Sequence, residues 1–348
     1  MLRKIYRTIV PKFIRSGVRR IIRIISGFIS QLRVFRKEYN ERKINYSYCT
    51  LLCDWIMCYI FLGASTEDYF IYKFYDKSWR QCRQFVTIRK SRFLIGHFNN
   101  GSEDERILVE DKTIFAEVFK DFIKRKTLSS ENLSKEKFIT FLNELGRVII
   151  KPADGYNGNN IYILKASDSE EDIQRAYESF SSHKYTIEEI LEQDGIMREL
   201  NPGTLNTMRV NVINNNGSFE IQNAILRSGQ GDKPVDNICA GGVVTWIDIN
   251  TGIAASPFCD LMDKRVISHP LTGVIMMGKK IPLWERVKEV AIEGAKRISK
   301  VKYTSWDIAV IKNEDVAIVE GNTYGTFNLQ QIINQNGLWE HYKRFITD

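Results

Sequence analysis

Two carboxylates and one amide in the C-terminal part of the chain have the residue types that bind a divalent cation. Asp307 precedes the apolar run 308–311, and Glu320 and Asn322 follow a second apolar run. If these runs pair as antiparallel strands around a loop at 312–315, Asp307 lies directly across from Glu320, and Asn322 shares that face. Facing carboxylates repel each other and burial adds a desolvation cost, both of which Mg²⁺ offsets. The hairpin therefore predicts a magnesium site, unless the strand ends fray and leave the acids merely exposed.

A lysine and a glycine-containing turn have the residue types that hold phosphate groups. Lys151 ends the apolar run 147–151, and Gly155 and Gly158 lie in the turn at 154–160. Backbone N–H groups of glycines can surround phosphate oxygens, and the lysine adds a positive charge. The pattern is neither a Walker A loop nor a dinucleotide fingerprint. It fits a phosphate-binding lid and also an ordinary hairpin turn.

Two glutamates end a third strand-like segment. Glu188 and Glu189 are followed by Ile190 and Leu191. A strand that leaves a lobe at this point could offer backbone groups and a carboxylate to adenine, with Leu191 packed on the ring. The alternative is a pair of glutamates that face solvent.

Two arginines lie near strand ends. Arg209 and Arg227 could each bind a phosphate or a substrate carboxylate through two hydrogen bonds. We interpret these two arginines and Lys151 as candidate catalytic residues. Arginines at such positions are also common on ordinary protein surfaces, so this alternative stays open.

The elements expected around these residues mix helices and strands without regular βαβ alternation, which predicts an α+β fold. Strands are expected at 147–151, 161–164, 185–190, 207–213, 219–227, 243–249, 306–311 and 316–320, and helices at 111–123, 169–180, 283–300 and 327–336. We expect four segments, namely a basic extension at 1–43, a helical region at 44–110, a small lid lobe at 111–190 and a C-terminal lobe at 191–348 that carries the metal site.

The positive charge of the chain is concentrated at its start. Residues 1–43 hold 13 Lys and Arg against two Asp and Glu, and the other 305 residues carry a net charge of −3. A basic stripe across the folded body is therefore missing, which argues against nucleic-acid binding. Apolar residues recur at helical spacing in residues 1–37, with Pro11 dividing the run. Such a helix suits an anionic membrane surface or packing on its own domain, but not a membrane span.

The cysteines and histidines do not have the spacing of a zinc site. Cys49, Cys53 and Cys58 lie in an apolar, aromatic stretch at 46–64 and are expected to be buried. Asp54 in the middle of this stretch favours a buried helix over a membrane span. Reduced thiols and the lack of a cleavable signal favour the cytoplasm, with peripheral contact at the inner face of the membrane.

The order of these features along the chain resembles that of the ATP-grasp superfamily, which includes D-alanine–D-alanine ligases and biotin carboxylases. The order runs from Asp111-Lys112 through Lys151, the glycine turn and Glu188-Glu189 to Asp307, Glu320 and Asn322. Three phrases resemble the sugar-transfer-associated branch, which is found with polysaccharide-synthesis genes. They are Asn206-Thr207-Met208-Arg209, Val235-Asp236-Asn237 with Gly241-Gly242, and Trp306-Asp307-Ile308-Ala309. The resemblance covers about residues 50–340.

This resemblance implies a fold of two α+β lobes that grip ATP, and it implies residue roles. Lys112 and Lys151 would contact ATP, and the turn at 154–160 would cover the phosphates. The segment from Glu188 to Leu191 would hold adenine, while the metal-site residues Asp307, Glu320 and Asn322 would coordinate Mg²⁺.

The resemblance also implies a ligase that phosphorylates a carboxylate and lets an amine attack the acylphosphate. We expect the carboxylate to belong to a sugar, such as a uronic acid, in capsular or other surface polysaccharide synthesis. D-alanine ligases have an arginine just before the metal aspartate, where this chain has Ser305-Trp306. Arg209 or Arg227 would then stabilise the intermediate. The alternatives are a phosphotransferase on the same fold and a non-catalytic nucleotide-binding scaffold at the membrane.

Overall fold

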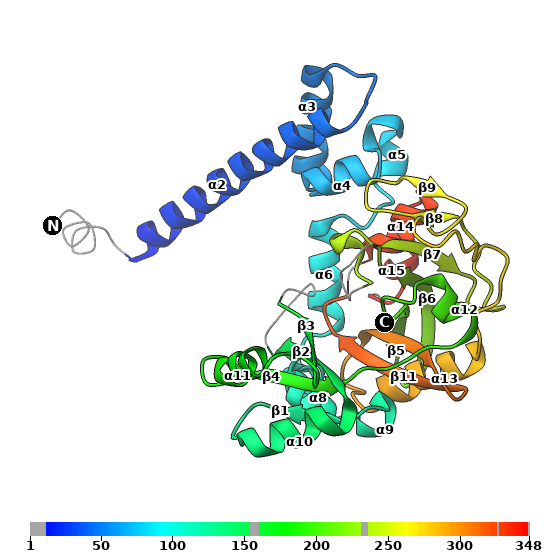
Figure 1. The fold of residues 1–348 in the computed structure, drawn as a ribbon. Coiled ribbons are helices and arrows are strands. Elements are labelled where there is room, and N and C mark those ends of the chain that lie inside the picture. Colours follow the sequence, from blue (N-terminus) through cyan, green and yellow to red (C-terminus); the bar gives the residue numbers. More distant parts are fainter. Residues whose placement is uncertain (1–11, 154–159, 231–235, 326, 347–348) are drawn as a thin grey trace. The chain divides into compact units, whose positions relative to one another are not determined.

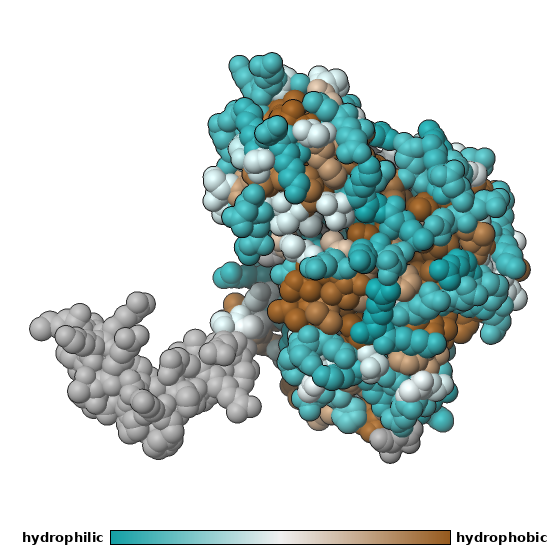
Figure 2. Space-filling model, turned by 90° about the horizontal axis from the view of Figure 1, so that it is seen from below, coloured by the Kyte–Doolittle hydropathy of each residue, from teal (hydrophilic) through white to brown (hydrophobic). Residues whose placement is uncertain are grey.

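The computed structural model describes residues 12–153, 160–230, 236–325 and 327–346, with side chains from Ser26 onward. The chain divides into two units, residues 1–90 and residues 91–348. Among the described residues, no helix has the length and apolar character needed to cross a membrane. On the face shown in Figure 2, hydrophilic residues cover most of the surface and hydrophobic residues gather in patches between them.

The described part of the first unit is helical (Figure 1). Its elements are α2 (Lys12–Glu41), α3 (Tyr48–Met57), the π-helix η1 (Cys58–Leu62), α4 (Thr66–Ile71), the 3₁₀-helix η2 (Phe74–Asp76) and α5 (Trp79–Cys82), and α6 (Ile88–Phe98) begins at its end. Serine side chains cap α3, α4 and α5 at their N-termini. These caps satisfy N–H groups that short helices would otherwise leave without partners.

Aromatic rings form the core of the first unit. The ring of Phe35 in α2 lies 5.2 Å from that of Trp55 and 5.0 Å from that of Phe70. Gln31 of α2 also accepts a hydrogen bond of 2.7 Å from the backbone of Thr66. From Ser26 onward, α2 therefore packs on the other helices of its own unit. The side chains before Ser26 are not described.

The expected burial of three cysteines is wrong for two of them. Cys58 is buried, but Cys49 and Cys53 are exposed. Helix α3 buries Leu51 and Trp55, one turn apart on one face. The two exposed cysteines are offset from these residues by two positions, so they lie on the opposite face of the helix.

The second unit holds the remaining helices and both sheets. Its helices are α7 (Glu103–Glu110), α8 (Lys112–Val118), α9 (Lys120–Ile123), α10 (Lys135–Leu145), α11 (Glu170–Ser179), α12 (Gly195–Leu200), the 3₁₀-helix η3 (Ile238–Ala240), α13 (Trp284–Lys296), α14 (Asn328–Asn334) and α15 (Trp339–Lys343).

A four-stranded antiparallel sheet forms the small lobe, in the order β1-β4-β2-β3. Its strands are β1 (Thr127–Ser129), β2 (Arg147–Pro152), β3 (Tyr162–Lys165) and β4 (Tyr185–Glu189). Along β2, Val148 and Ile150 are buried in one core with Phe138 of α10 and Ala176 of α11. Side chains alternate between the faces of a strand, so Ile149 and Lys151 lie on the face away from these helices.

A seven-stranded antiparallel sheet forms the large lobe, in the order β11-β10-β5-β6-β7-β8-β9. Its strands are β5 (Thr207–Asn215), β6 (Ser218–Ser228), β7 (Val243–Ile247), β8 (Phe258–Cys259), β9 (Arg265–Val266), β10 (Tyr303–Ile311) and β11 (Asp315–Asn322). Helix α13 packs on this sheet, and its Trp284 and Val287 share a core with Trp306 and Ile308 of β10. Sheets and helices mixed in this way confirm the α+β class.

Candidate functional site

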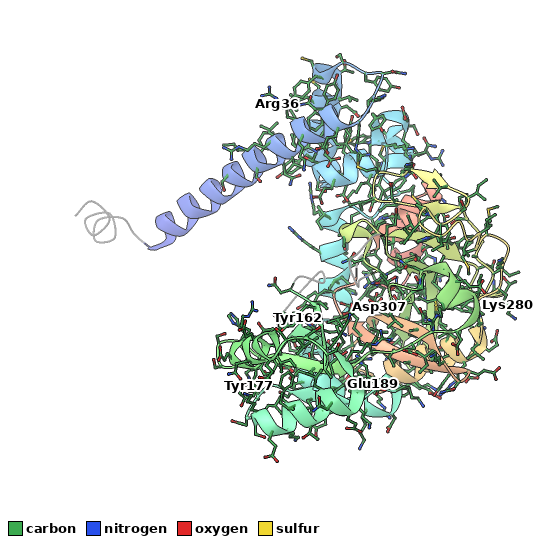
Figure 3. All side chains as sticks on the ribbon, viewed as in Figure 1. Arg36, Tyr162, Tyr177, Glu189, Lys280 and Asp307 are labelled. Carbon is green, nitrogen blue, oxygen red and sulfur yellow. The ribbon has the colours of Figure 1, made fainter. Side chains whose placement is uncertain are left out.

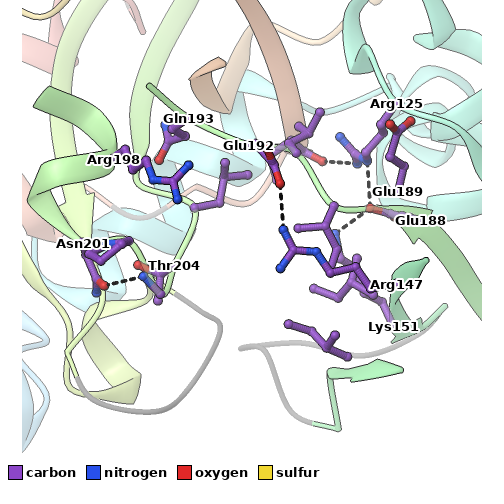
Figure 4. A pocket seen from close by; sticks show the side chains of 18 residues that line it. Arg125, Arg147, Lys151, Glu188, Glu189, Glu192, Gln193, Arg198, Asn201 and Thr204 are labelled. Carbon is purple, nitrogen blue, oxygen red and sulfur yellow. Dashed lines mark hydrogen bonds and ion pairs between the residues drawn. The ribbon is translucent and has the colours of Figure 1, made fainter. Parts of the chain in front are cut away.

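A pocket of about 230 Å³ lies in the second unit, between the small sheet and residues of the large lobe (Figure 4). It is lined by Arg125, Arg147, Ile149, Lys151, Ile163, residues 188–193, Arg198, residues 201–205 and Val319. Ile149 and Ile163 give it an apolar wall on the small sheet, and Leu191 and Leu205 add further apolar surface. A mainly apolar pocket with a few fixed polar groups is typical of a small-molecule site.

Glu188 is buried on β4, with 5% of its surface exposed. Its Oε2 accepts hydrogen bonds from Lys151 Nζ at 2.7 Å and from Arg125 Nε at 2.8 Å. Burial alone would raise the pKa of Glu188, but the charges of Arg125 and Lys151 outweigh it and lower the pKa to about 2. Glu188 is therefore a permanent anion that fixes a lysine at the pocket wall, and it is not a solvent-facing glutamate.

The other glutamate of the pair is placed differently. Glu189 accepts a hydrogen bond of 3.0 Å from the backbone N–H of Lys126. Glu189, Ile190 and Leu191 all line the pocket. The structure thus gathers Lys151, Glu188, Glu189 and Leu191 around one pocket.

Arg125 connects the small lobe to the large one. Besides Glu188, its guanidinium donates to the carbonyl oxygens of Ile318 at 3.1 Å and Val319 at 2.9 Å, both on β11. Only 5% of its side chain is exposed. The sequence pattern does not indicate this residue, because Arg125 stands between Lys124 and Lys126 in a run typical of solvated surface.

Lys112 lies at the start of α8, directly after Asp111, which caps that helix through the backbone N–H groups of Thr113 and Ile114. Lys112 Nζ donates to the carbonyl oxygen of Pro152 at 2.5 Å. This contact places Lys112 close to the end of β2. The glycines of the turn, Gly155 and Gly158, lie outside the described residues.

Asp307 is the centre of a second buried group of charges. It is 1% exposed, and Arg209 holds both of its oxygens, with Nε 2.8 Å from Oδ1 and Nη2 2.7 Å from Oδ2. Arg227 Nη1 donates to Oδ2 at 2.8 Å. Burial would raise the pKa of Asp307, but these two arginines lower it far below its ordinary range.

Arg227 is shared between two acids. Its other terminal nitrogen, Nη2, donates to Asp236, which also accepts a hydrogen bond of 3.1 Å from the backbone N–H of Thr207. The side chain of Arg227 is 9% exposed, whereas that of Arg209 is 20% exposed. Of the two arginines, Arg209 is therefore the better placed to reach a substrate.

Asp307 pairs with Glu320 across the hairpin, but by a different route from the one expected. Ile311 pairs with Asp315, so the turn is one residue shorter than the loop at 312–315. This alone would place Asp307 across from Val319. The register shifts by one residue between Asp307 and Ile308, where Val319 is the extra residue of a β-bulge on β11. Asp307 therefore pairs with Glu320.

Glu320 and Asn322 lie beside Asp307 at this end of the hairpin. The side chain of Glu320 is 51% exposed, and Arg209 Nη2 is 3.8 Å from its Oε1. Asn322 Nδ2 donates to the same oxygen at 3.5 Å. Desolvation and the negative charge of Asp307 raise the pKa of Glu320.

The oxygens of this group are of the type that a divalent cation prefers. Asp236, Asp307 and Glu320 give three negative charges against the two positive charges of Arg209 and Arg227. A carboxylate has about four lone-pair positions, and the oxygens of Asp307 accept three hydrogen bonds from the arginines. No group of three or more His, Cys, Asp or Glu suited to a metal occurs among the described residues. A metal here would thus need the amide oxygen of Asn322 in addition to two carboxylates.

Lys151 and Glu188 lie on strands of the small sheet and Asp307 lies on a strand of the large sheet. Figure 3 labels Asp307 and Glu189, the neighbour of Glu188 on β4. Arg125 links the two sheets, since it binds Glu188 and the carbonyl of Val319, the residue directly before Glu320. A unit of two sheets, with a mainly apolar pocket between them that carries a few fixed charges, agrees with the class that the sequence resembles.

Residues 89–346 match the sequence profile of the family described as sugar-transfer-associated ATP-grasp. This match covers most of the chain, and the chain therefore belongs to that family. The resemblance seen in the sequence is confirmed. A comparison with curated proteins finds no significant match.

Several solved structures are similar to parts of this chain. The ATP-grasp ligase PsnB, complexed with a minimal precursor, Mg and ADP, is 16% identical over 72% of this chain and 61% of its own, with a TM-score of 0.45. D-alanyl-alanine synthetase A from Vibrio cholerae is 13% identical over 69% of this chain and 64% of its own, with a TM-score of 0.43. Biotin carboxylase from Campylobacter jejuni is 16% identical over 69% of this chain and 46% of its own, with a TM-score of 0.44. The chain thus spans less than two thirds of these proteins.

Proposed function

We propose that this protein is an Mg-ATP-dependent ligase that joins a carboxylate to an amine through an acylphosphate. The observation that carries the proposal is the buried chain of contacts from Lys151 through Glu188 and Arg125 to Val319. It ties a lysine at the pocket wall to the residue before Glu320. These buried contacts would therefore fix the distance between Lys151, which would bind phosphate, and the oxygens that would bind the metal.

The pocket would hold the nucleotide. Adenine would lie against Ile149 and Ile163, with the segment from Glu189 to Leu191 along its edge. Lys151 and Lys112, both near the end of β2, would contact phosphate oxygens, and Gly155 and Gly158 would cover them. Glu188 keeps Lys151 oriented, and the group of Glu188, Arg125 and Lys151 retains a net positive charge that attracts phosphate.

Asp307, Glu320 and Asn322 would hold Mg²⁺, which supplies positive charge to the phosphate oxygens. Arg227 acts as a positioning residue, because it is fixed between Asp236 and Asp307. Arg209 lies between Asp307 and the half-exposed Glu320, where its guanidinium can contact the transferred phosphoryl group or the acyl carboxylate.

The proposed reaction has two steps, which these residues would support by position and charge. A carboxylate oxygen of the acceptor attacks the γ-phosphorus of ATP, and the bond from that phosphorus to the bridging oxygen breaks to give ADP and an acylphosphate. The amine nitrogen then attacks the acyl carbon, phosphate leaves with the bonding electrons, and the nitrogen loses a proton to give the amide. Positioning and charge stabilisation account for most of the acceleration in such phosphoryl transfers.

The acceptor would be a carboxylate-bearing sugar, such as a uronic acid, in capsular or other surface polysaccharide synthesis. Support for the sugar comes from the sugar-transfer association of the family. Support for a location in the cytoplasm at the inner face of the membrane comes from the 13 Lys and Arg in residues 1–43.

The test is a phosphorus NMR product profile with Mg-ATP, a panel of uronic-acid sugars and an amino-acid mixture. ADP and phosphate should form only when acid and amine are both present, and Asp307→Asn should abolish their formation. Asp315→Asn, at the other end of the same hairpin, is the matched control and should keep activity. A stable phosphorylated sugar without amine would replace the ligase by a phosphotransferase, and intact ATP with every acceptor, including lipid-linked sugars, would favour the scaffold.

A further inference from the structure

Four large hydrophobic side chains are exposed together on the first unit. Met57, Ile60 and Phe61 are 49%, 54% and 61% exposed, at the end of α3 and in the π-helix η1. The spacing between these three residues places them on one side of the continuous helix. The ring of Phe61 lies 6.3 Å from the ring of Trp79 in α5, which is 44% exposed. We call these four residues the aromatic surface.

A cation is fixed at the edge of this surface. Arg89 Nη2 donates to the carbonyl oxygens of Tyr59 and Ile60, both at 2.8 Å. Arg80 and Arg83 are exposed next to Trp79 in the sequence, and Ile88, beside Arg89, is 38% exposed. The surface thus combines apolar and aromatic side chains with arginines around them.

The first unit as a whole is also positively charged. Residues 1–90 contain 19 Lys and Arg against six Asp and Glu, whereas residues 91–348 contain 31 against 36. Trp and Phe beside Arg are typical of the interface between water and a bilayer, where the ring enters the acyl boundary and the cation meets the headgroups. A cluster of exposed apolar residues on so basic a unit therefore matches an anionic bilayer in both charge and polarity.

We infer that Met57, Ile60, Phe61 and Trp79 insert into the headgroup region of an anionic membrane and anchor the first unit there. None of these four residues belongs to the basic extension at residues 1–43, and the inference does not depend on the proposed ligase reaction. Attraction by the extension and by Arg80, Arg83 and Arg89 brings the unit to the membrane. Insertion of the aromatic surface then fixes which side of the unit faces the lipid.

The experiment measures how the full-length chain partitions onto phosphatidylglycerol–phosphatidylcholine vesicles, without nucleotide. Ile60→Glu should weaken the partition constant about tenfold, because it removes apolar insertion and adds a negative charge. Ile107→Glu is the matched control, since Ile107 is 53% exposed but lies on α7 among Glu103, Asp104 and Glu110. It should leave the partition constant unchanged.

Trp79 provides a second readout that a merely structural effect would not produce. Its emission, taken as the difference between the natural protein and Trp79→Phe, should move to shorter wavelength on the vesicles and be quenched by brominated lipid chains. Equal binding by Ile60→Glu and the natural protein would overturn the inference and leave the extension as the sole anchor. Shielding of Trp79 from acrylamide in the free protein, or a dimer that Ile60→Glu dissociates, would show that another surface covers these residues and would also overturn it.

Discussion

Glu188 and Asp307, two buried acids of the second unit, are bound in the same way but differ in their surroundings. Each accepts hydrogen bonds from two cationic side chains, Arg125 and Lys151 for Glu188, and Arg209 and Arg227 for Asp307. Around Glu188 the two cations exceed the one acid. Around Asp307 the arginines are outnumbered, because Asp236 and Glu320 add two further negative charges.

This difference in charge separates two tasks. An excess of positive charge at a pocket wall suits phosphate, and an excess of negative charge suits a divalent cation. The burial of both acids keeps water from screening these charges. One buried acid would thus orient groups that bind the nucleotide, and the other would take part in holding the metal.

The largest expected effect comes from breaking the Asp307 group at Arg227. Arg227→Met leaves Asp236 and Asp307 with fewer cations in a buried setting, and we expect the free energy of unfolding to fall by about 3–5 kcal/mol. Urea denaturation measures this loss. Arg175→Met is the control, because its side chain is 72% exposed beside an Asp172 side chain that is 50% exposed, and such a pair contributes at most about 1 kcal/mol. Equal losses of unfolding free energy in the two variants would show that Arg227 stabilises the fold no more than an exposed arginine does.

The second prediction removes the negative charge of Glu188 from its group with Arg125 and Lys151. Glu188→Gln leaves Arg125 and Lys151 without their anion, and the lowering of the pKa of Glu188 from 4.5 to about 2 corresponds to about 3 kcal/mol of stability at neutral pH. Urea denaturation at pH 7 checks this value. Glu192→Gln, which alters the exposed pair with Arg147, should cost far less.

The same residue gives a prediction for pH. The pKa of Glu188 is lower in the folded chain than in the unfolded one, so the unfolded state binds more protons between these values. The stability that Glu188 contributes is complete above about pH 4.5 and is lost as the pH falls toward about 2. The difference in unfolding free energy between the natural protein and Glu188→Gln should shrink over this range. A constant difference would mean that Glu188 acts through shape and not through charge.

Arg125 tests the link between the two groups, with a smaller effect on stability. Arg125→Lys keeps a cation for Glu188 but cannot also reach the carbonyls of Ile318 and Val319. We expect a loss of about 1–2 kcal/mol, the contribution of one or two hydrogen bonds. We also expect Mg²⁺ to strengthen the binding of a non-hydrolysable ATP analogue less than in the natural protein. Calorimetry with and without Mg²⁺ measures this, and an unchanged Mg²⁺ effect would show that the link is only structural.

The hairpin shows how far the sequence could predict the site. Counting back from the assumed loop paired Asp307 with Glu320, which is the pairing in the structure. The count was right only because the error in turn length is cancelled by the bulge at Val319. Bulges depend on contacts outside the strand, and here Arg125 binds the carbonyl of Val319. A local pattern of apolar residues does not contain this information.

The fold was easier to predict than the contacts between distant residues. Strands such as β5 and β6 follow from runs of apolar residues around Asn216-Gly217, a strong turn signal. Arg125 could not be found in this way, because its acceptors on β11 are 193 and 194 residues further along the chain. Its sequence neighbours are lysines, and only the packed structure shows that it is buried.

The smallest expected effect comes from Glu320, and its sign distinguishes the two groups most clearly. Glu320 faces the negative charge of Asp307, which raises its pKa along with desolvation, so its charge opposes folding in the absence of a cation. Glu320→Gln should therefore raise the free energy of unfolding by up to about 1 kcal/mol without Mg²⁺, in contrast to Glu188→Gln, and should abolish any stabilisation that Mg²⁺ gives. Thermal unfolding with Mg²⁺ and with a chelator measures both effects. A large loss of stability in Glu320→Gln without Mg²⁺ would mean that Glu320, like Glu188, is an acid that the fold itself requires.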